Sequence, residues 1–159
     1  MIRLITASLA IFLVGVFQTG ASSWLAIWLA PPDLPLLLTI SLGLTCGPVA
    51  GMLAGFGSAL VQAGLSQSYL LAHALGLIVS GFVAGELSRR FFREHWLVPV
   101  ASVLILTLMS ELLFWLAAPA SSGLSPRWLA IRLLYNTALA WPCFRLTARA
   151  REALPARAL

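Results

Sequence analysis

The sequence predicts an all-α polytopic membrane protein, with six transmembrane helices in a single integral membrane domain that covers residues 1–159. Hydrophobic residues make up 60% of the chain and charged residues only 9%, and the mean hydropathy is +0.96. Soluble domains are about 45–50% apolar and about 25% charged, and a small soluble globule could not bury so much apolar surface. Disordered chains are polar and charged, so disorder is excluded as well. Six spans of about 20 residues leave room for short loops, but none for a soluble catalytic domain.

The first predicted helix covers residues 4–30 and ends at Pro31-Pro32-Asp33, because consecutive prolines cannot continue a helix. Its start resembles a signal peptide, since Arg3 precedes an apolar run and small residues follow at 19–23. The apolar character resumes at Trp24, however, and we therefore expect an uncleaved first helix.

The next apolar stretch, residues 34–65, is too long for one comfortable span and short for two. Gly47-Pro48 lies near its middle, and a residue before proline is disfavoured in the helical region. We therefore predict two helices, over 34–46 and 48–65. The first would reach only about 20 Å at 1.5 Å per residue, so a partial or re-entrant element is the alternative to a full crossing.

Three further helices are predicted over residues 69–87, 96–118 and 127–146, separated by turn-forming and charged segments. The chain has ten arginines and no lysine, and cytoplasmic loops of membrane proteins carry the excess of basic residues. With six crossings and both termini in the cytoplasm, eight of the ten arginines lie on the cytoplasmic side. With five crossings the arginine clusters would lie on opposite sides. The eight are Arg3, Arg89, Arg90, Arg93, Arg145, Arg149, Arg151 and Arg157.

Small residues recur at helical spacing in two of the predicted helices. Such stripes let helix backbones approach closely inside a membrane, either within the chain or against a partner helix. The predicted packing positions are Gly51, Gly55, Gly76, Gly81 and Gly85.

Two charged residues fall well inside predicted spans, Glu111 and Arg132. Each lies roughly 8–10 Å from the outer end of its helix at 1.5 Å per residue. A lone charge in a membrane is costly, so we predict an intramembrane ion pair that fixes helix register. A proton or substrate relay and a polar patch for a partner are the alternatives.

Recognised catalytic or metal-binding motifs are absent from the sequence, and we expect neither an enzyme nor a cofactor. The polar residues His73, Gln62 and Asn136 are dispersed over separate helices. The net charge of +5 is explained by topology, so we expect no nucleic-acid partner. Arg89, Arg90 and Arg93 form a predicted cytoplasmic basic loop that could touch anionic lipid or cytoplasmic proteins.

The order of these motifs resembles the family of the rod-shape-determining protein MreD. The similar segments are Pro32-Asp33-Leu34, Gly47-Pro48, Gly55-Phe56, Ala72-His73-Ala74-Leu75 and Tyr135-Asn136 through Pro142. The resemblance covers most of the chain and is strongest over residues 32–85. It implies a fold similar to that of the substrate-binding subunits of energy-coupling-factor vitamin transporters.

The resemblance also implies a function, that of a non-enzymatic scaffold of cell elongation, rod shape and peptidoglycan synthesis in the bacterial inner membrane. It implies MreC as direct partner, and MreB and the RodA–transpeptidase pair as indirect ones. The mechanism expected is small-residue packing against a partner's transmembrane helix. The alternative function is the substrate-binding subunit of a small-solute transporter, with an outward cavity lined by His73, Trp24, Glu111 and Arg132.

Overall fold

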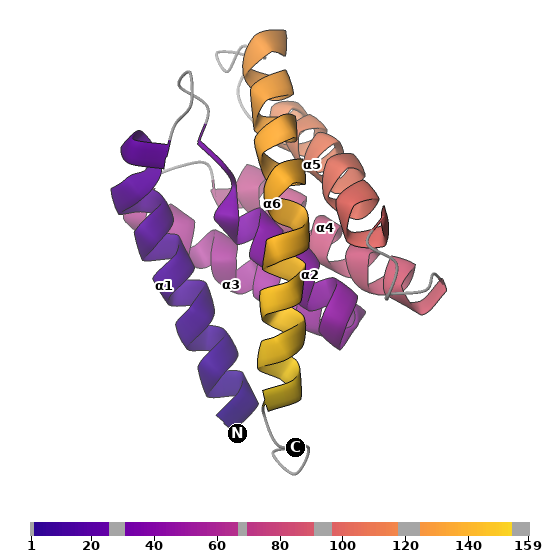
Figure 1. Cartoon of the computed structure of the whole chain (residues 1–159). Coiled ribbons are helices and arrows are strands. Elements are labelled where there is room, and N and C mark those ends of the chain that lie inside the picture. The colour runs from indigo at the N-terminus through magenta and orange to yellow at the C-terminus, as the bar shows by residue number, and fades with distance from the viewer. Residues whose placement is uncertain (1, 26–30, 67–69, 91–96, 118–124, 154–159) are drawn as a thin grey trace.

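A computed structural model describes residues 2–25, 31–66, 70–90, 97–117 and 125–153, and this part of the chain is helical throughout apart from short connections. Figure 1 shows the helices packed as one bundle. The helices are α1 (Ile2–Leu25), α2 (Leu34–Cys46), α3 (Pro48–Ser66), α4 (Leu70–Arg90), α5 (Leu97–Ala117) and α6 (Pro126–Ala153).

The predicted break between 34–46 and 48–65 is confirmed, since α2 ends at Cys46 and α3 begins at Pro48. Gly47 between them has a φ of 99°, a value that L-residues with a side chain rarely adopt. Its N–H still donates to Gly43 O at 2.9 Å, which ends α2 with a satisfied backbone group. The chain therefore turns at a single glycine, and proline begins the next helix where no N–H is needed.

Two predicted helix ends are wrong. Arg89 and Arg90, expected in a loop, form the last turn of α4. The arginine-rich tail expected after residue 146 continues α6 to Ala153, with Pro142 inside the helix. Arginine is a good helix former and its charge suits a helix C-terminus, so charge alone did not mark the end of either helix.

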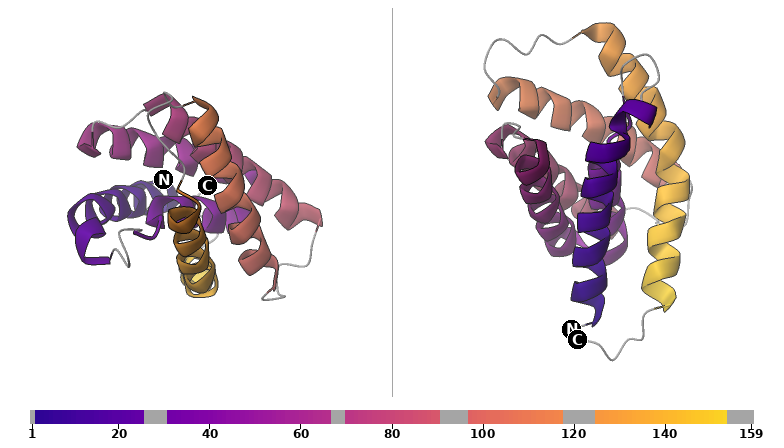
Figure 2. Two further views of the ribbon diagram at one scale, coloured as in Figure 1. Left: turned by 90° about the horizontal axis from the view of Figure 1, so that it is seen from above. Right: turned by 90° about the vertical axis from the view of Figure 1, so that its left-hand side faces the viewer.

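Among the described residues, three helices are long and apolar enough to cross a membrane, which indicates a membrane protein. These spans are Pro48–Leu65, Leu70–Arg90 and Leu97–Ala117. The apolar segments Leu9–Gly20 and Leu34–Cys46 are shorter. The start of α1 and the last turn of α6 lie at the same end of the molecule in Figure 1 and in the right-hand view of Figure 2.

The short helix α2 lies at the centre of the bundle, in contact with each of the other five helices. Leu36, Leu37 and Ile40 are completely buried, and most of the helix is inaccessible on every side. A helix of 13 residues can be surrounded in this way because longer helices extend past both of its ends. The N-terminus of α2 thereby brings a polar residue, Asp33, into the interior of the protein.

Glycines allow α2 and α3 to pack against α4 at backbone distance. A Cβ atom at Gly51 would collide with Gly81 O, and one at Gly81 would collide with Gly51 O. A Cβ at Gly55 would lie 2.5 Å from Leu77 O, closer than real Cβ atoms approach other atoms. Inside a membrane no hydrophobic effect drives helices together, so their association depends on close packing. The absence of side chains at these positions lets the backbones come close enough for extensive dispersion contacts.

Candidate functional site

Asp33 occupies the N-cap of the central helix. Its carboxylate Oδ1 accepts a hydrogen bond from Leu36 N at 3.0 Å, and its carbonyl accepts one from Leu37 N at 3.0 Å. Pro31 and Pro32 cannot continue a helix, and aspartate is among the residues that best satisfy the free N–H groups of a helix start. The local sequence thus fixes an aspartate, only 8% exposed as a whole residue, at the buried end of α2.

Arg132 of α6 connects this carboxylate to a second one. Arg132 Nη1 lies 2.7 Å from Glu111 Oε1 of α5, and Arg132 Nη2 pairs with Asp33 Oδ2. The predicted partners Glu111 and Arg132 are thus in contact, and Asp33 is a third member that sequence reasoning missed. The three side chains are 9%, 16% and 11% exposed in the order Glu111, Arg132, Asp33. We call these three residues the charge cluster.

The indole of Trp128 adds to the charge cluster from one turn earlier on α6. Its ring centroid lies 4.8 Å from Arg132 Cζ, within the range of a cation–π contact. The remaining guanidinium nitrogen, Nε, is buried without a hydrogen-bond partner in the described part of the chain. The cation is therefore held by two carboxylates and one aromatic face.

Asn136, one turn after Arg132, makes a second link between the same three helices. Its Oδ1 accepts from Asp33 N at 2.9 Å, and its Nδ2 donates to Thr107 Oγ1 of α5 at 3.4 Å. Asn136 and Thr107 are fully buried. The expectation that Asn136 is an isolated polar residue is wrong. Its spacing of four from Arg132, like that of Thr107 from Glu111, was the signal that both pairs share a helix face.

The first helix joins this network through Gln18. Its Nε2 donates to Pro32 O at 2.8 Å, and its Oε1 accepts from Leu34 N at 3.3 Å. Because Pro32 and Leu34 flank Asp33, the backbone that carries the cap is held from α1 as well as from α6. Nothing in the local sequence marked Gln18 for this role.

His73, which the transporter alternative placed on a cavity wall, lies beside the charge cluster on α4. Its ring packs against Phe114 of α5 at 4.7 Å between centroids, with the planes tilted by 41°. Glu111 and Arg132, two other expected cavity residues, form an ion pair with each other. The side chain of Trp24, the fourth, lies outside the described residues.

The five predicted packing glycines all lie in buried contacts within the chain. Gly51 and Gly81 meet each other, and Gly55 meets the backbone of Leu77. Gly76 faces Ser110 of α5, and Gly85 faces Pro48. Of the two uses expected for these stripes, the structure has the internal one, so these glycines offer no open face to a partner helix.

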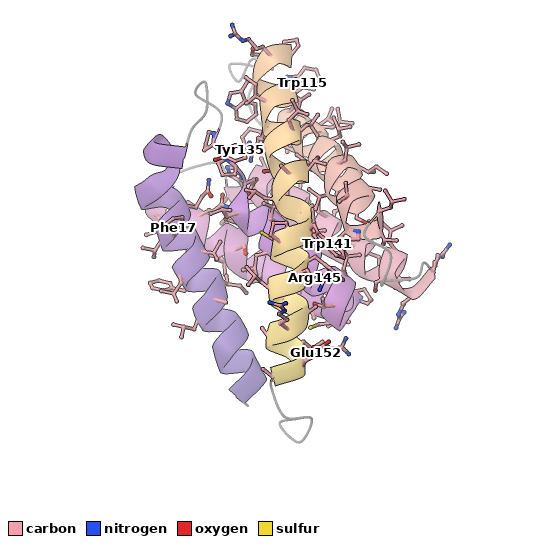
Figure 3. All side chains as sticks on the ribbon, in the orientation of Figure 1. Phe17, Trp115, Tyr135, Trp141, Arg145 and Glu152 are labelled. Atoms are coloured by element: carbon pink, nitrogen blue, oxygen red, sulfur yellow. The ribbon has the colours of Figure 1, made fainter. Side chains whose placement is uncertain are left out.

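The predicted basic loop is only partly described. Arg89 pairs with Glu86 at 3.2 Å across one turn of α4, and its side chain is 64% exposed. Arg90 is exposed beside it, and Arg93 lies outside the described residues. On α6, Trp141, Arg145 and Glu152 follow one another toward the C-terminal end, with Arg145 Cζ 4.8 Å from the ring centroid of Trp141 (Figure 3).

The chemistry available to the charge cluster is that of charge pairing and hydrogen bonding. Within the described ranges, no group of three or more histidine, cysteine, aspartate or glutamate residues is arranged to hold a metal ion. Comparison with known proteins adds no assignment, because neither a family model nor a curated protein nor a solved structure matches this chain.

Proposed function

We propose that this chain is a non-enzymatic membrane scaffold of the bacterial cell-elongation machinery, of the MreD kind, and that it binds MreC. One observation carries the proposal: residues of the sequence resemblance are those that hold the bundle together. Asp33 caps α2 and pairs with Arg132, Gly47 separates α2 from α3, and Gly55 admits the backbone of α4. The resemblance therefore involves residues that determine the fold. On this basis we propose that the chain shares the role of the family as well as its fold.

The use of the buried polar groups supports a packing role. Asp33, Glu111, Arg132 and Asn136 are engaged with one another across three helices. A carrier usually presents several converging polar groups to its substrate near the midplane of the bilayer. Here the corresponding groups stabilise the bundle itself, as a protein that works by contact with other membrane proteins requires.

The proposed binding surface is apolar and lies on the outside of the bundle. Since the glycine stripes pack against other helices of the same chain, a partner helix would pack against exposed aliphatic and aromatic side chains. Such side chains gather on the outer faces of α1, α3 and α5. The α1 face has Leu9, Phe12, Leu13, Val16 and Phe17, the α3 face has Met52, Leu53, Phe56 and Leu60, and the α5 face has Leu104, Ile105, Leu108 and Leu112.

We further propose six crossings of the inner membrane with both termini in the cytoplasm. This topology places Arg89 and Arg90 on the same side as the arginine-rich end of α6. In the proposed scaffold, this basic side would face anionic lipid and, through MreC, the MreB filament and the RodA–transpeptidase pair.

Co-expression with MreC and purification in mild detergent tests the proposal. We expect a stable complex, and absence of any complex would contradict the proposal. Three matched triple variants then locate the contact: Leu9, Phe12 and Leu13 to alanine on α1, Leu53, Phe56 and Leu60 to alanine on α3, and Ile105, Leu108 and Leu112 to alanine on α5. We expect one triple to abolish co-purification and the other two to preserve it, with the amount of scaffold in the membrane unchanged in all three.

A further inference from the structure

The charge cluster contains more negative than positive charge. Two carboxylates, Asp33 and Glu111, face the single guanidinium of Arg132, so the fully ionised cluster carries one excess negative charge. All three side chains are largely buried between helices. An uncompensated charge in such a place is strongly unfavourable, and a buried pair of carboxylates relieves it when one of them keeps its proton.

The two carboxylates are not equivalent. Asp33 accepts a hydrogen bond from Leu36 N and lies at the N-terminus of α2, where the helix dipole favours negative charge. Glu111 has neither advantage, because Arg132 is its one polar contact among the described residues. The ionised form is therefore favoured at Asp33, and the proton belongs on Glu111.

Other charged or titratable groups face the charge cluster from the packed helices in the described part of the chain. On α6, Arg127 lies exposed more than one turn before Arg132. On α4, His73 is partly buried with its ring against Phe114, and it interacts electrostatically with Asp33 and Arg132. A proton on His73 is therefore the competing way to neutralise the cluster. Glu86, Arg89 and Arg90 lie at the far end of α4.

We propose that the charge cluster is a proton-binding site, which holds one proton on Oε2 of Glu111. Oε1 of Glu111 then accepts a hydrogen bond from Arg132 Nη1, and Asp33 pairs as a carboxylate with Arg132 Nη2. A carboxylic acid, a guanidinium and a carboxylate together carry no net charge. A neutral site of this kind can stand inside a membrane without a bound metal cation. The inference is independent of the scaffold role.

Infrared spectroscopy of the full chain in phosphatidylethanolamine–phosphatidylglycerol vesicles at neutral pH tests the proposal. We expect a C=O stretch of a protonated carboxylic acid. Asp33 is the only aspartate among the five acidic residues, so carboxyl-¹³C aspartate labels this one group. The band should shift in protein labelled with ¹³C at the glutamate side-chain carboxyl, and should not shift with labelled aspartate.

The variant Glu111→Gln should abolish the band completely, whereas the matched variant Glu86→Gln, at an exposed pair with Arg89, should retain it. The labelling arms use the unmodified chain, so they decide the matter even where a variant folds poorly. Three outcomes would overturn the proposal: no band in the wild-type protein, a band that shifts with labelled aspartate, or a band that survives in Glu111→Gln. The wild-type protein would show no such band if the excess charge were neutralised by a proton on His73 or by a bound metal cation.

Discussion

The two sides of the central helix are held by opposite means. Toward α4, the packing of α2 and α3 depends on the absence of side chains, at Gly43 of α2 and at Gly51 of α3, which both meet Gly81 of α4. Toward α5 and α6, α2 is held by long polar side chains that meet Asp33 at its N-terminus. The glycine side tolerates no added volume. The polar side tolerates changes of size, but no charge or hydrogen-bonding group left without its partner.

The largest effect is expected for Arg132→Gln. This change leaves the buried carboxylate of Asp33 without a cation and removes the partner of Glu111, and breaking a buried ion pair costs about 3–5 kcal/mol. Denaturant unfolding in detergent and the level of protein in the membrane measure the loss. The control Arg89→Gln, at an exposed pair, should change stability by less than about 1 kcal/mol. An unchanged level and stability for Arg132→Gln would refute the structural role of the cluster.

The next largest effect is expected for Gly81→Ala. The added methyl group would collide with Gly51 O, a backbone atom that cannot rotate away, and we expect destabilisation by about 1–3 kcal/mol. At Gly64, where nothing lies within 4 Å, the same substitution should be neutral or stabilising by up to about 1 kcal/mol. Equal unfolding free energies for the two variants would mean that the glycine contact is not made.

A smaller effect is expected for Asn136→Ala, which leaves the N–H of Asp33 buried without an acceptor. The cost of one such group is about 1–3 kcal/mol, and we place this variant toward the lower end because the charge cluster remains. The control is Thr137→Val on the next residue, whose buried hydroxyl has no partner in the described part of the chain. Thermal unfolding should separate the two variants, and coincident curves would argue against the second link.

The parts of the fold that the sequence predicted correctly depend on local chemistry. The break at Gly47-Pro48 follows from two adjacent residues, and the bounds of α2 follow from it. The continuation of α4 through Arg90 was missed because arginine marks membrane topology and helix ends alike.

The candidate site was predictable only in part, because its members are distant in sequence. Glu111 and Arg132 were noticed as rare charges in apolar helices, and adjacent helices made their contact a natural expectation. Asp33 was assigned to a turn, since its partner Arg132 is 99 residues away and its other partner Asn136 is 103 residues away. Helix capping explains why an aspartate precedes α2. It does not predict that the other helices enclose α2 and so bury this aspartate.

The central claim is that Arg132 stabilises the bundle by compensating the buried carboxylate of Asp33. A double-mutant cycle with Asp33→Asn, Arg132→Gln and the combined variant measures this directly as a coupling free energy of unfolding. Asparagine can still cap α2 but carries no charge. Removing the carboxylate should relieve part of the damage done by removing the cation, so the double variant should be more stable than Arg132→Gln alone, by at least about 1 kcal/mol. Losses that simply add, with a coupling near zero, would contradict the account.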